Sequence, residues 1–161
     1  MIYILIIILG LILDRVSKIY AINNFIENPI SGKILNFTYL ENRGAAFGIL
    51  QNNRFFFIIL TIVIVGFLIY YFIKNYKKNS RFLNVAIAFI IAGALGNFYD
   101  RLFNAYVVDF IEFAFVKFPV FNVADIFVTL GSGLLIIYMI FFDQSEKIKW
   151  VLISEMIGIY F

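Results

Sequence analysis

Four long apolar segments constrain the fold of this 161-residue chain more than any other feature. They lie near residues 2–20, 55–73, 82–99 and 121–142. A helix needs about 20 apolar residues to cross roughly 30 Å of hydrocarbon, and each segment is close to that length. Because 63% of residues are hydrophobic and 14% charged, the chain is too apolar for a soluble domain. The sequence therefore predicts an all-α membrane protein with four transmembrane helices, forming one integral membrane domain over 1–161.

The longest connection, residues 23–54, predicts a small β segment. Leu35, Phe37 and Tyr39 alternate with polar residues, which is the period of a strand. We expect this segment to lie on the outer face of the membrane, with Phe47 dipping toward lipid.

The distribution of basic residues predicts the orientation. The loop 74–81 carries four of them, Lys74, Lys77, Lys78 and Arg81, and such loops favour the cytoplasmic side. Both termini would then be cytoplasmic. The segment 2–20 lacks a basic start and a small-residue cleavage site, so we interpret it as a retained helix. The tail 143–161 is too short to span after its charges, which indicates an interfacial segment.

The chain contains neither histidine nor cysteine. This excludes a Ser-His-Asp triad, a cysteine nucleophile, an HExxH zinc site and disulfide bonds. A net charge of +3, spread along the chain, does not indicate nucleic-acid binding. No nucleotide, metal or haem signature occurs, so we expect no cofactor.

Charged residues first interrupt the apolar pattern at Asp14 and Lys18. They are four residues apart, so they share a helix face and can pair. Two interpretations stay open: a self-neutralising pair near the interface, or a pair that supports a functional site. A Ser17–Lys18 dyad is disfavoured because adjacent helical side chains point about 100° apart.

Polar residues concentrate between Gly93 and Asp125. Gly93, Asn97, Asp100 and Arg101 are predicted to share one helix face, where we expect Arg101 to hold a carboxylate with its two-pronged guanidinium. Asp109 lies among valine and phenylalanine residues, where burial would raise its pKa. Asn122 could simply cap the last helix. Asp125 lies further inside that helix and is harder to explain as a cap.

Helices that alternate in direction bring these residues to one side of the membrane. The end of the first segment, the end of the third and the start of the fourth all emerge on the same face. We therefore expect a functional cavity near the outer face. Carboxylates without histidine suggest a pair that activates water and shares one proton. Asp100, Asp109 and Asp125 are the candidates, and spacing alone does not choose between them.

Five motifs occur in order: DRVSK from Asp14, NRGAAFG from Asn42, GALGNFYDR from Gly93, VVDF from Val107 and FNVAD from Phe121. In these the chain resembles the lipoprotein signal peptidases, also called type II signal peptidases, four-helix intramembrane aspartic peptidases of bacteria. The resemblance implies cleavage of a prolipoprotein just before a diacylglyceryl-modified cysteine in the bacterial cytoplasmic membrane. We expect a monomer whose partners are the lipid-modified substrate and the phospholipid bilayer.

The resemblance also implies roles for individual residues. The catalytic aspartates carry over onto Asp109 and Asp125, which leaves Asp100 a supporting residue. Positions expected to shape the site or hydrogen-bond within it are Asp14, Lys18, Asn42, Gly44, Gly93, Asn97, Asp100, Arg101, Asn122 and Ala124. The chain departs from the family at Ile126, which is bulky, and in the short, Phe-rich connection from Asp109 to Asp125.

The alternative from another class is a small transporter or ion-conducting subunit with Asp14, Lys18 and Asp125 as a charge relay. Such a relay needs ionisable groups through the whole membrane depth, and the segment 55–73 has none. A purely structural relative of the peptidases is a third interpretation.

Overall fold

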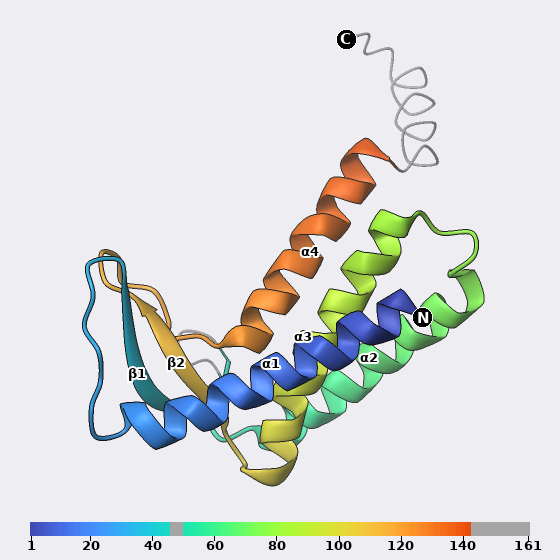
Figure 1. Ribbon diagram of the computed structural model, residues 1–161. Helices are drawn as coiled ribbons and strands as arrows, with labels where there is room; N and C mark the ends of the chain where they lie inside the picture. Colours follow the sequence, from blue (N-terminus) through green and yellow to red (C-terminus); the bar gives the residue numbers. More distant parts are fainter. Residues whose placement is uncertain (46–49, 143–161) are drawn as a thin grey trace, which may run out of the picture.

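The computed structural model describes residues 1–45 and 50–142, so Phe47 and the tail 143–161 lie outside the described residues. In the described part the chain forms four α-helices and one two-stranded sheet (Figure 1). The helices are α1 (Ile2–Phe25), α2 (Arg54–Asn75), α3 (Arg81–Phe103) and α4 (Val123–Phe141), and the strands are β1 (Leu35–Asn42) and β2 (Val107–Phe113).

The helix ends differ from the predicted ones for local reasons. α1 continues to Phe25 instead of residue 20 because Ala21 and Phe25, both buried, pack against the sheet. α3 continues to Phe103, so that Asp100 and Arg101 are helical. α4 begins at Val123 because Asn122 caps it from outside the helix.

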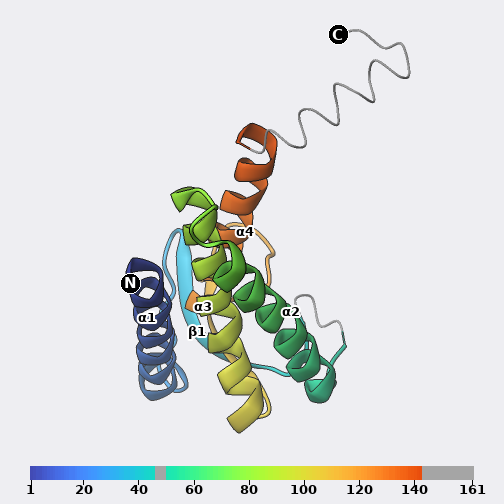
Figure 2. The same ribbon diagram turned by 90° about the vertical axis from the view of Figure 1, so that its right-hand side faces the viewer.

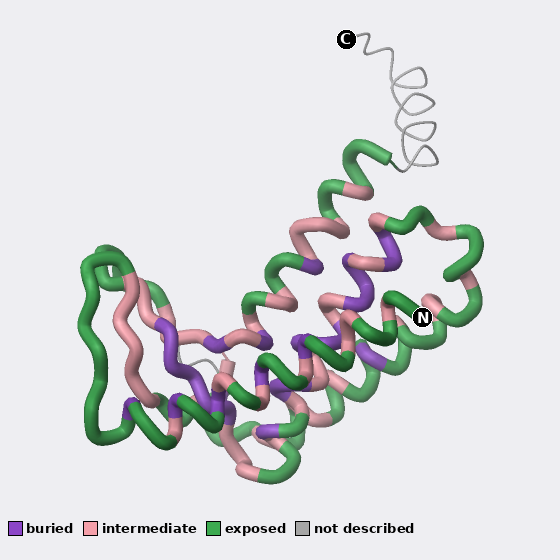
Figure 3. Tube along the Cα trace, in the orientation of Figure 1, coloured by how far each residue is buried: buried purple, intermediate pink, exposed green. Residues whose placement is uncertain are grey.

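Helix α3 is the centre of the bundle. It packs against α1, α2 and α4, and its contact with α4 is the most extensive of the three (Figure 2). Close approach to α4 depends on Gly93, because a Cβ there would collide with the backbone of Ala124 and Val128. Buried positions accordingly concentrate along α3 and β2 (Figure 3).

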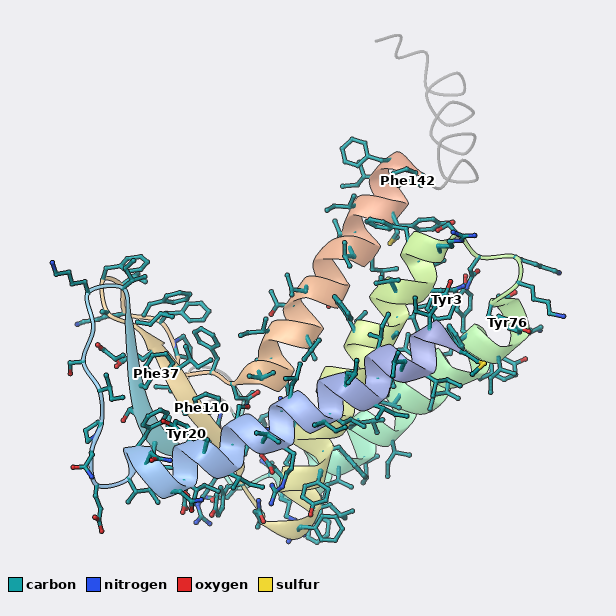
Figure 4. The ribbon with its side chains drawn as sticks, in the orientation of Figure 1. Tyr3, Tyr20, Phe37, Tyr76, Phe110 and Phe142 are labelled. Carbon is teal, nitrogen blue, oxygen red and sulfur yellow. The ribbon has the colours of Figure 1, made fainter. Side chains whose placement is uncertain are left out.

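The sheet lies at one end of the bundle, opposite the loop between α2 and α3 (Figure 1). Strands β1 and β2 are antiparallel, with Leu40 opposite Asp109, and the register is irregular between Phe37 and Leu40. Phe25 of α1 joins the sheet to the bundle: its ring centroid lies 5.6 Å from that of Phe37 and 6.4 Å from that of Phe110. Figure 4 shows Phe37 and Phe110 on the sheet, near the end of α1. The predicted strand is therefore present, and it pairs with a second strand that the sequence pattern did not indicate.

Three of the described helices, α2, α3 and α4, are long and apolar enough to cross a membrane. Helix α1 has 24 residues but carries Asp14, Arg15 and Lys18, which lower its apolar character. The described chain is thus a mostly helical protein with three candidate membrane spans and a small antiparallel sheet.

Candidate active site

Lys18 lies at the centre of a buried polar network. Its side chain is 0% exposed, and its ammonium group contacts Asp14 Oδ2 at 2.9 Å and Asp100 Oδ2 at 2.9 Å. It also donates to Asn97 Oδ1 at 3.0 Å. These three partners use all three N–H donors of a lysine, which is the condition for burying such a charge at tolerable free energy. The predicted Asp14–Lys18 pair is confirmed, and it is part of the larger polar network around Lys18.

Asp14 connects α1 to the start of α4. Its Oδ1 accepts the backbone N–H of Ala124 at 2.9 Å, one of the N–H groups that a helix leaves unpaired in its first turn. A Cβ on Gly96 would lie 2.6 Å from Asp14 Oδ2, so only glycine leaves room for the carboxylate at this position. Small residues at Gly96 and Ala124 therefore let α1, α3 and α4 meet around one charge.

Asp100 is held from several sides. Besides Lys18, it contacts Arg15 Nη1 at 3.3 Å and accepts the backbone N–H of Val108 at 3.3 Å. Two cations and two carboxylates, counting Asp14, balance within this part of the network.

The side chain of Asn122 both caps α4 and bonds to other side chains of the site. Its Oδ1 accepts the backbone N–H of Asp125 at 3.0 Å, while Asp125 Oδ2 accepts the backbone N–H of Asn122 at 3.1 Å, which completes a capping box. Its Nδ2 donates to Asp109 Oδ1 at 2.6 Å and to Asn97 Oδ1 at 3.1 Å. Asn122 therefore caps α4, as the sequence suggested, and it also bonds to Asp109, which the sequence did not indicate.

The sheet explains why Asn122 reaches Asp109. Phe121 forms an antiparallel bridge with Ile111, with N···O distances of 2.8 and 2.9 Å. Because that bridge fixes the chain beside β2, α4 begins next to Asp109, which belongs to the same strand.

Three asparagine side chains orient the carboxyl groups of Asp109 and Asp125. Asn42 Nδ2 donates to Asp109 Oδ2 at 2.8 Å, so each oxygen of Asp109 accepts one amide. Asn97 Nδ2 donates to Asp125 Oδ1 at 2.7 Å. Asp109 is 1% exposed. Burial, followed by the neighbouring charge of Asp125, raises the pKa of Asp109 to about 7, although the bonds from the two asparagines oppose this shift.

The expectation that Arg101 holds a carboxylate with its guanidinium is wrong. Within residues 1–45 and 50–142 it makes no ion pair; its Nη2 donates instead to the carbonyl of Gly44 at 3.2 Å, and its guanidinium lies 4.7 Å from the centre of the Phe57 ring. The reason is geometric: Asp100 already faces Lys18 and Arg15 on the α1 side of α3. Gly44 in turn donates its N–H to Asn42 Oδ1 at 3.0 Å, so Arg101 steadies the segment that carries Asn42.

A pocket of about 480 Å³ lies beside these groups. Its polar lining consists of Asn42, Asn97, Arg101, Asp109, Asp125 and Thr129, and the rest is apolar: Ala45, Val107, Phe113, Phe118, Pro119, Val120, Phe121, Ile126, Val128 and Leu130. Asp109 and Asp125 both line it, whereas Asp14 and Asp100 do not. The bulky Ile126 forms part of the wall.

The structure brings together every predicted site residue. Gly93 acts through helix packing and Gly44 through its backbone; the others contribute side chains or, for Ala124, a backbone N–H. Sequence reasoning missed Arg15 and Gly96. Arg15 lies three residues before Lys18 and so on a neighbouring part of the same helix surface, which is a signal that could have found it. No sequence pattern indicates Gly96, because the need for glycine at this position depends on where Asp14 lies in the structure.

Apolar helices, buried charges and a pocket lined by two carboxyl groups define a membrane-embedded protein with an enzyme-like site. The family described as signal peptidase (SPase) II matches residues 6–141, and the chain belongs to this family.

Individual relatives agree with the family. The chain is 45% identical to a lipoprotein signal peptidase of Clostridioides difficile (strain 630), over 91% of this chain and 100% of that protein. It is 46% identical to one of Clostridium novyi (strain NT), over 85% of this chain and 96% of the other. A bacterial membrane enzyme solved by the in meso method at 2.3 Å resolution has a similar structure, with a TM-score of 0.79, 42% identity, and coverage of 86% of this chain and 87% of that one.

Proposed function

We propose that this protein is an aspartic endopeptidase that removes signal peptides from prolipoproteins, cleaving before a diacylglyceryl-modified cysteine with Asp109 and Asp125. Membership of the signal peptidase II family and the names of the curated relatives support the reaction. The observation that carries the choice of residues is that Asp109 and Asp125 are the carboxyl groups that line one pocket. Asp14 and Asp100 are instead neutralised by Lys18 and Arg15.

The pair acts as a unit that shares one proton. Water enters between the scissile carbonyl and the pair; the ionised carboxylate takes a proton from the water, whose oxygen bonds to the carbonyl carbon. The neutral carboxyl group donates its proton to the carbonyl oxygen. As the tetrahedral intermediate collapses, the proton held by the first carboxylate passes to the leaving nitrogen, one hydroxyl proton of the intermediate returns to the second carboxyl group, and the C–N bond breaks. With the pKa of Asp109 at about 7, one proton is available on the pair near neutral pH.

The surrounding residues hold the pair in position. Asn42 and Asn122 fix Asp109, while Asn97 and the capping box fix Asp125. Lys18 fixes Asn97 through its carbonyl oxygen. The mainly apolar pocket suits a lipid-modified substrate and lowers the water content around the reacting atoms.

For the membrane arrangement we propose four spans, with α1 as the fourth. At 24 residues α1 is about 36 Å long, which is enough to cross the bilayer. Its charges Asp14 and Lys18 are buried in the bundle, and the side chains it exposes are mostly apolar, among them Ile4, Leu5, Ile8, Leu9, Ile12, Leu13 and Val16. Charges that face the bundle do not prevent a helix from spanning.

The proposed orientation places the basic α2–α3 connection and both termini in the cytoplasm and the sheet and pocket near the outer face of the bacterial cytoplasmic membrane. We further propose one integral membrane domain that works as a monomer. The polar groups of the described site pair with one another, so they do not require a residue from a second copy. The transporter alternative has no support of this kind, because α2 carries no charged residue between Arg54 and Lys74.

The test is cleavage of a fluorogenic lipopeptide bearing a diacylglyceryl cysteine by the purified protein in detergent micelles. We expect cleavage by the parent, and a loss of at least about a thousandfold in Asp109→Asn and in Asp125→Asn. The matched control is Glu27→Gln, which neutralises an exposed carboxyl group away from the pocket and leaves turnover unchanged. Turnover retained in either aspartate variant contradicts the proposed pair. An intact substrate with folded parent protein contradicts the reaction.

A further inference from the structure

A second pocket, of about 530 Å³, continues from the one that contains the aspartates. The two share Asn42, Ala45, Phe118, Pro119 and Val120. The remaining lining of the second pocket is Leu40, Glu41, Gln51, Glu112 and Lys117. A chain bound at the aspartates can therefore continue into this second pocket.

The two pockets differ in the elements that line them. The first includes Ile126, Val128, Thr129 and Leu130, four residues along α4, so it extends beside a membrane-spanning helix. The second contains no residue of α4 and gathers charged side chains from the strands and the following loop. Charged linings are stable next to water and costly in lipid. The second pocket therefore opens on the aqueous side of the site.

The three charged groups of the second pocket are not equally available. Glu41 is neutralised by Arg43, with an N···O distance of 2.8 Å. Glu112 is half-buried and accepts Asn36 Nδ2 at 3.1 Å. Lys117 is exposed, and within residues 1–45 and 50–142 it has neither an ion pair nor a hydrogen bond. Among the described lining residues, Glu112 keeps its negative charge but is half-buried and bonded to Asn36, so the exposed charge without a partner is the positive one of Lys117.

We propose that the second pocket binds the segment of the prolipoprotein that follows the modified cysteine, and that Lys117 makes the enzyme prefer acidic residues there. This inference rests on the proposed function. The signal peptide and the acyl chains remain with the lipid, so the rest of the substrate has to leave toward water. The second pocket provides that exit directly beside the aspartates. An exposed ion pair contributes little, so the preference is moderate and sensitive to salt.

The experiment uses the full chain in zwitterionic micelles with three lipopeptides. They differ only in one residue among the first four after the cysteine, which is Asp, Asn or Lys. We expect the Asp peptide to have a KM about two to four times lower than the Lys peptide at low salt, with kcat unchanged. The difference should disappear in about 1 M NaCl, where the Debye length is roughly 3 Å.

Substitutions at Lys117 give the decisive comparison. Lys117→Gln should remove the preference, and Lys117→Glu should reverse it, while the Asn peptide is cleaved equally by all three proteins. The matched control is Lys33→Glu, which changes the net charge equally at an exposed position outside both pockets. If Lys33→Glu shifts the preference as much as Lys117→Glu, the effect belongs to overall charge and the inference is wrong.

Three other outcomes also test the proposed role of Lys117. A preference unchanged in Lys117→Glu overturns the inference while leaving the proposed function intact, because the Asn peptide is still cleaved. If Lys117→Glu alters KM equally for all peptides, and only in vesicles that contain an anionic phospholipid, Lys117 contacts lipid headgroups instead. If the folded parent cleaves none of the peptides, the proposed function fails and this inference fails with it.

Discussion

A network of polar side chains lies toward each end of α3, and the two networks differ in kind. Toward the sheet lies a charged network made of Asp14, Arg15, Lys18, Asn97, Asp100, Asp109, Asn122 and Asp125. Toward the α2–α3 loop lies an amide network made of Tyr71, Asn75, Asn79 and Asn84. Asn84 and Asn97 are both buried residues of α3, so one helix contributes a central asparagine to each network.

The amide network is local and uncharged. Asn84 donates to the carbonyl of Tyr76 at 2.9 Å and accepts Asn79 Nδ2 at 3.1 Å, and Tyr71 donates to Asn79 Oδ1 at 3.4 Å. These partners are at most eight residues apart in the sequence. The network therefore fixes the turn between two consecutive helices, and its residues line neither of the two described pockets.

The charged network joins distant parts of the chain. Lys18 and Asn97 are 79 residues apart, and Asp14 and Ala124 are 110 apart. Its members include carboxyl groups that border a pocket. Neutral amides that bond only to near neighbours are explained by folding alone. Burying charges costs free energy, so buried charges that join four segments beside a cavity indicate a functional site.

The largest expected effect is that of Lys18→Met, which removes the cation between Asp14 and Asp100. Two buried carboxylates then lose a partner, so the free energy of unfolding should fall by about 3 to 5 kcal/mol. Unfolding by denaturing detergent in mixed micelles measures the change. The double variant Lys18→Met, Asp14→Asn should recover part of it, because Arg15 still neutralises Asp100 and an amide oxygen can still accept the N–H of Ala124. A double variant less stable than the single one contradicts this account.

Gly96→Ala tests whether the charged network depends on close helix packing. The new Cβ would lie 2.6 Å from Asp14 Oδ2, so Asp14 has to move away from Lys18 or Ala124. We expect a loss of about 1 to 3 kcal/mol in the free energy of unfolding. Gly66→Ala in α2 is the matched control: a Cβ there meets nothing within 4 Å, so the better helix former should stabilise the protein by about 0.5 to 1 kcal/mol. Equal losses in both variants would show that the site requires no special packing.

Asn42→Ala tests the electrostatics of the pair. Above pH 7 the activity of the parent should decline, because Asp109 loses the proton that the proposed mechanism needs. The bond from Asn42 lowers the pKa of Asp109, so its removal should move this decline to higher pH. We expect kcat/KM at neutral pH to fall about tenfold as well, because Asp109 is less well oriented. A pH profile of kcat/KM that keeps its alkaline limb in place contradicts the assignment to Asp109.

The raised pKa of Asp109 also predicts how stability depends on pH. The folded state keeps a proton on Asp109 up to about pH 7, whereas the unfolded chain releases it near the ordinary value of 3.8. Between these values the folded state binds more protons, so the contribution of this group to stability falls as pH rises. Asp109→Asn should remove that part of the slope in a series of unfolding measurements. An unchanged slope would contradict the raised pKa.

Part of this arrangement follows directly from the sequence. The four-residue spacing of Asp14 and Lys18 predicts their pairing, and alternating helix direction predicts that both meet Asn97 and Asp125 at one side. These inferences succeed because they rest on local helix geometry and on the length of the apolar segments.

The rest depends on contacts that local patterns do not show. The polar residues of Val107–Phe113 are Asp109 and Glu112, three positions apart, so the segment lacks the alternation of a half-exposed strand and its pairing with β1 was not predicted. The strand that carries Asp109 therefore required the structure, as did the two roles of Asn122, which depend on the bridge between Phe121 and Ile111. Asp100 and Arg101 are adjacent in the sequence, but their side chains point about 100° apart and contact different elements, which explains why the predicted carboxylate partner of Arg101 was wrong.

The smallest expected effect comes from the amide network. Asn84→Ala removes two hydrogen bonds near the α2–α3 turn, and we expect a loss of about 1 kcal/mol in the free energy of unfolding with lipopeptide cleavage unchanged. Asn97→Ala is the same substitution on the same helix. It removes the hydrogen bonds of Asn97 to Lys18 and Asp125, so it should reduce cleavage strongly. Both variants are measured at a temperature where each is folded, so that stability does not mask turnover. If Asn84→Ala slows cleavage as much as Asn97→Ala, the two networks are coupled through α3 and the separation of folding from catalysis is wrong.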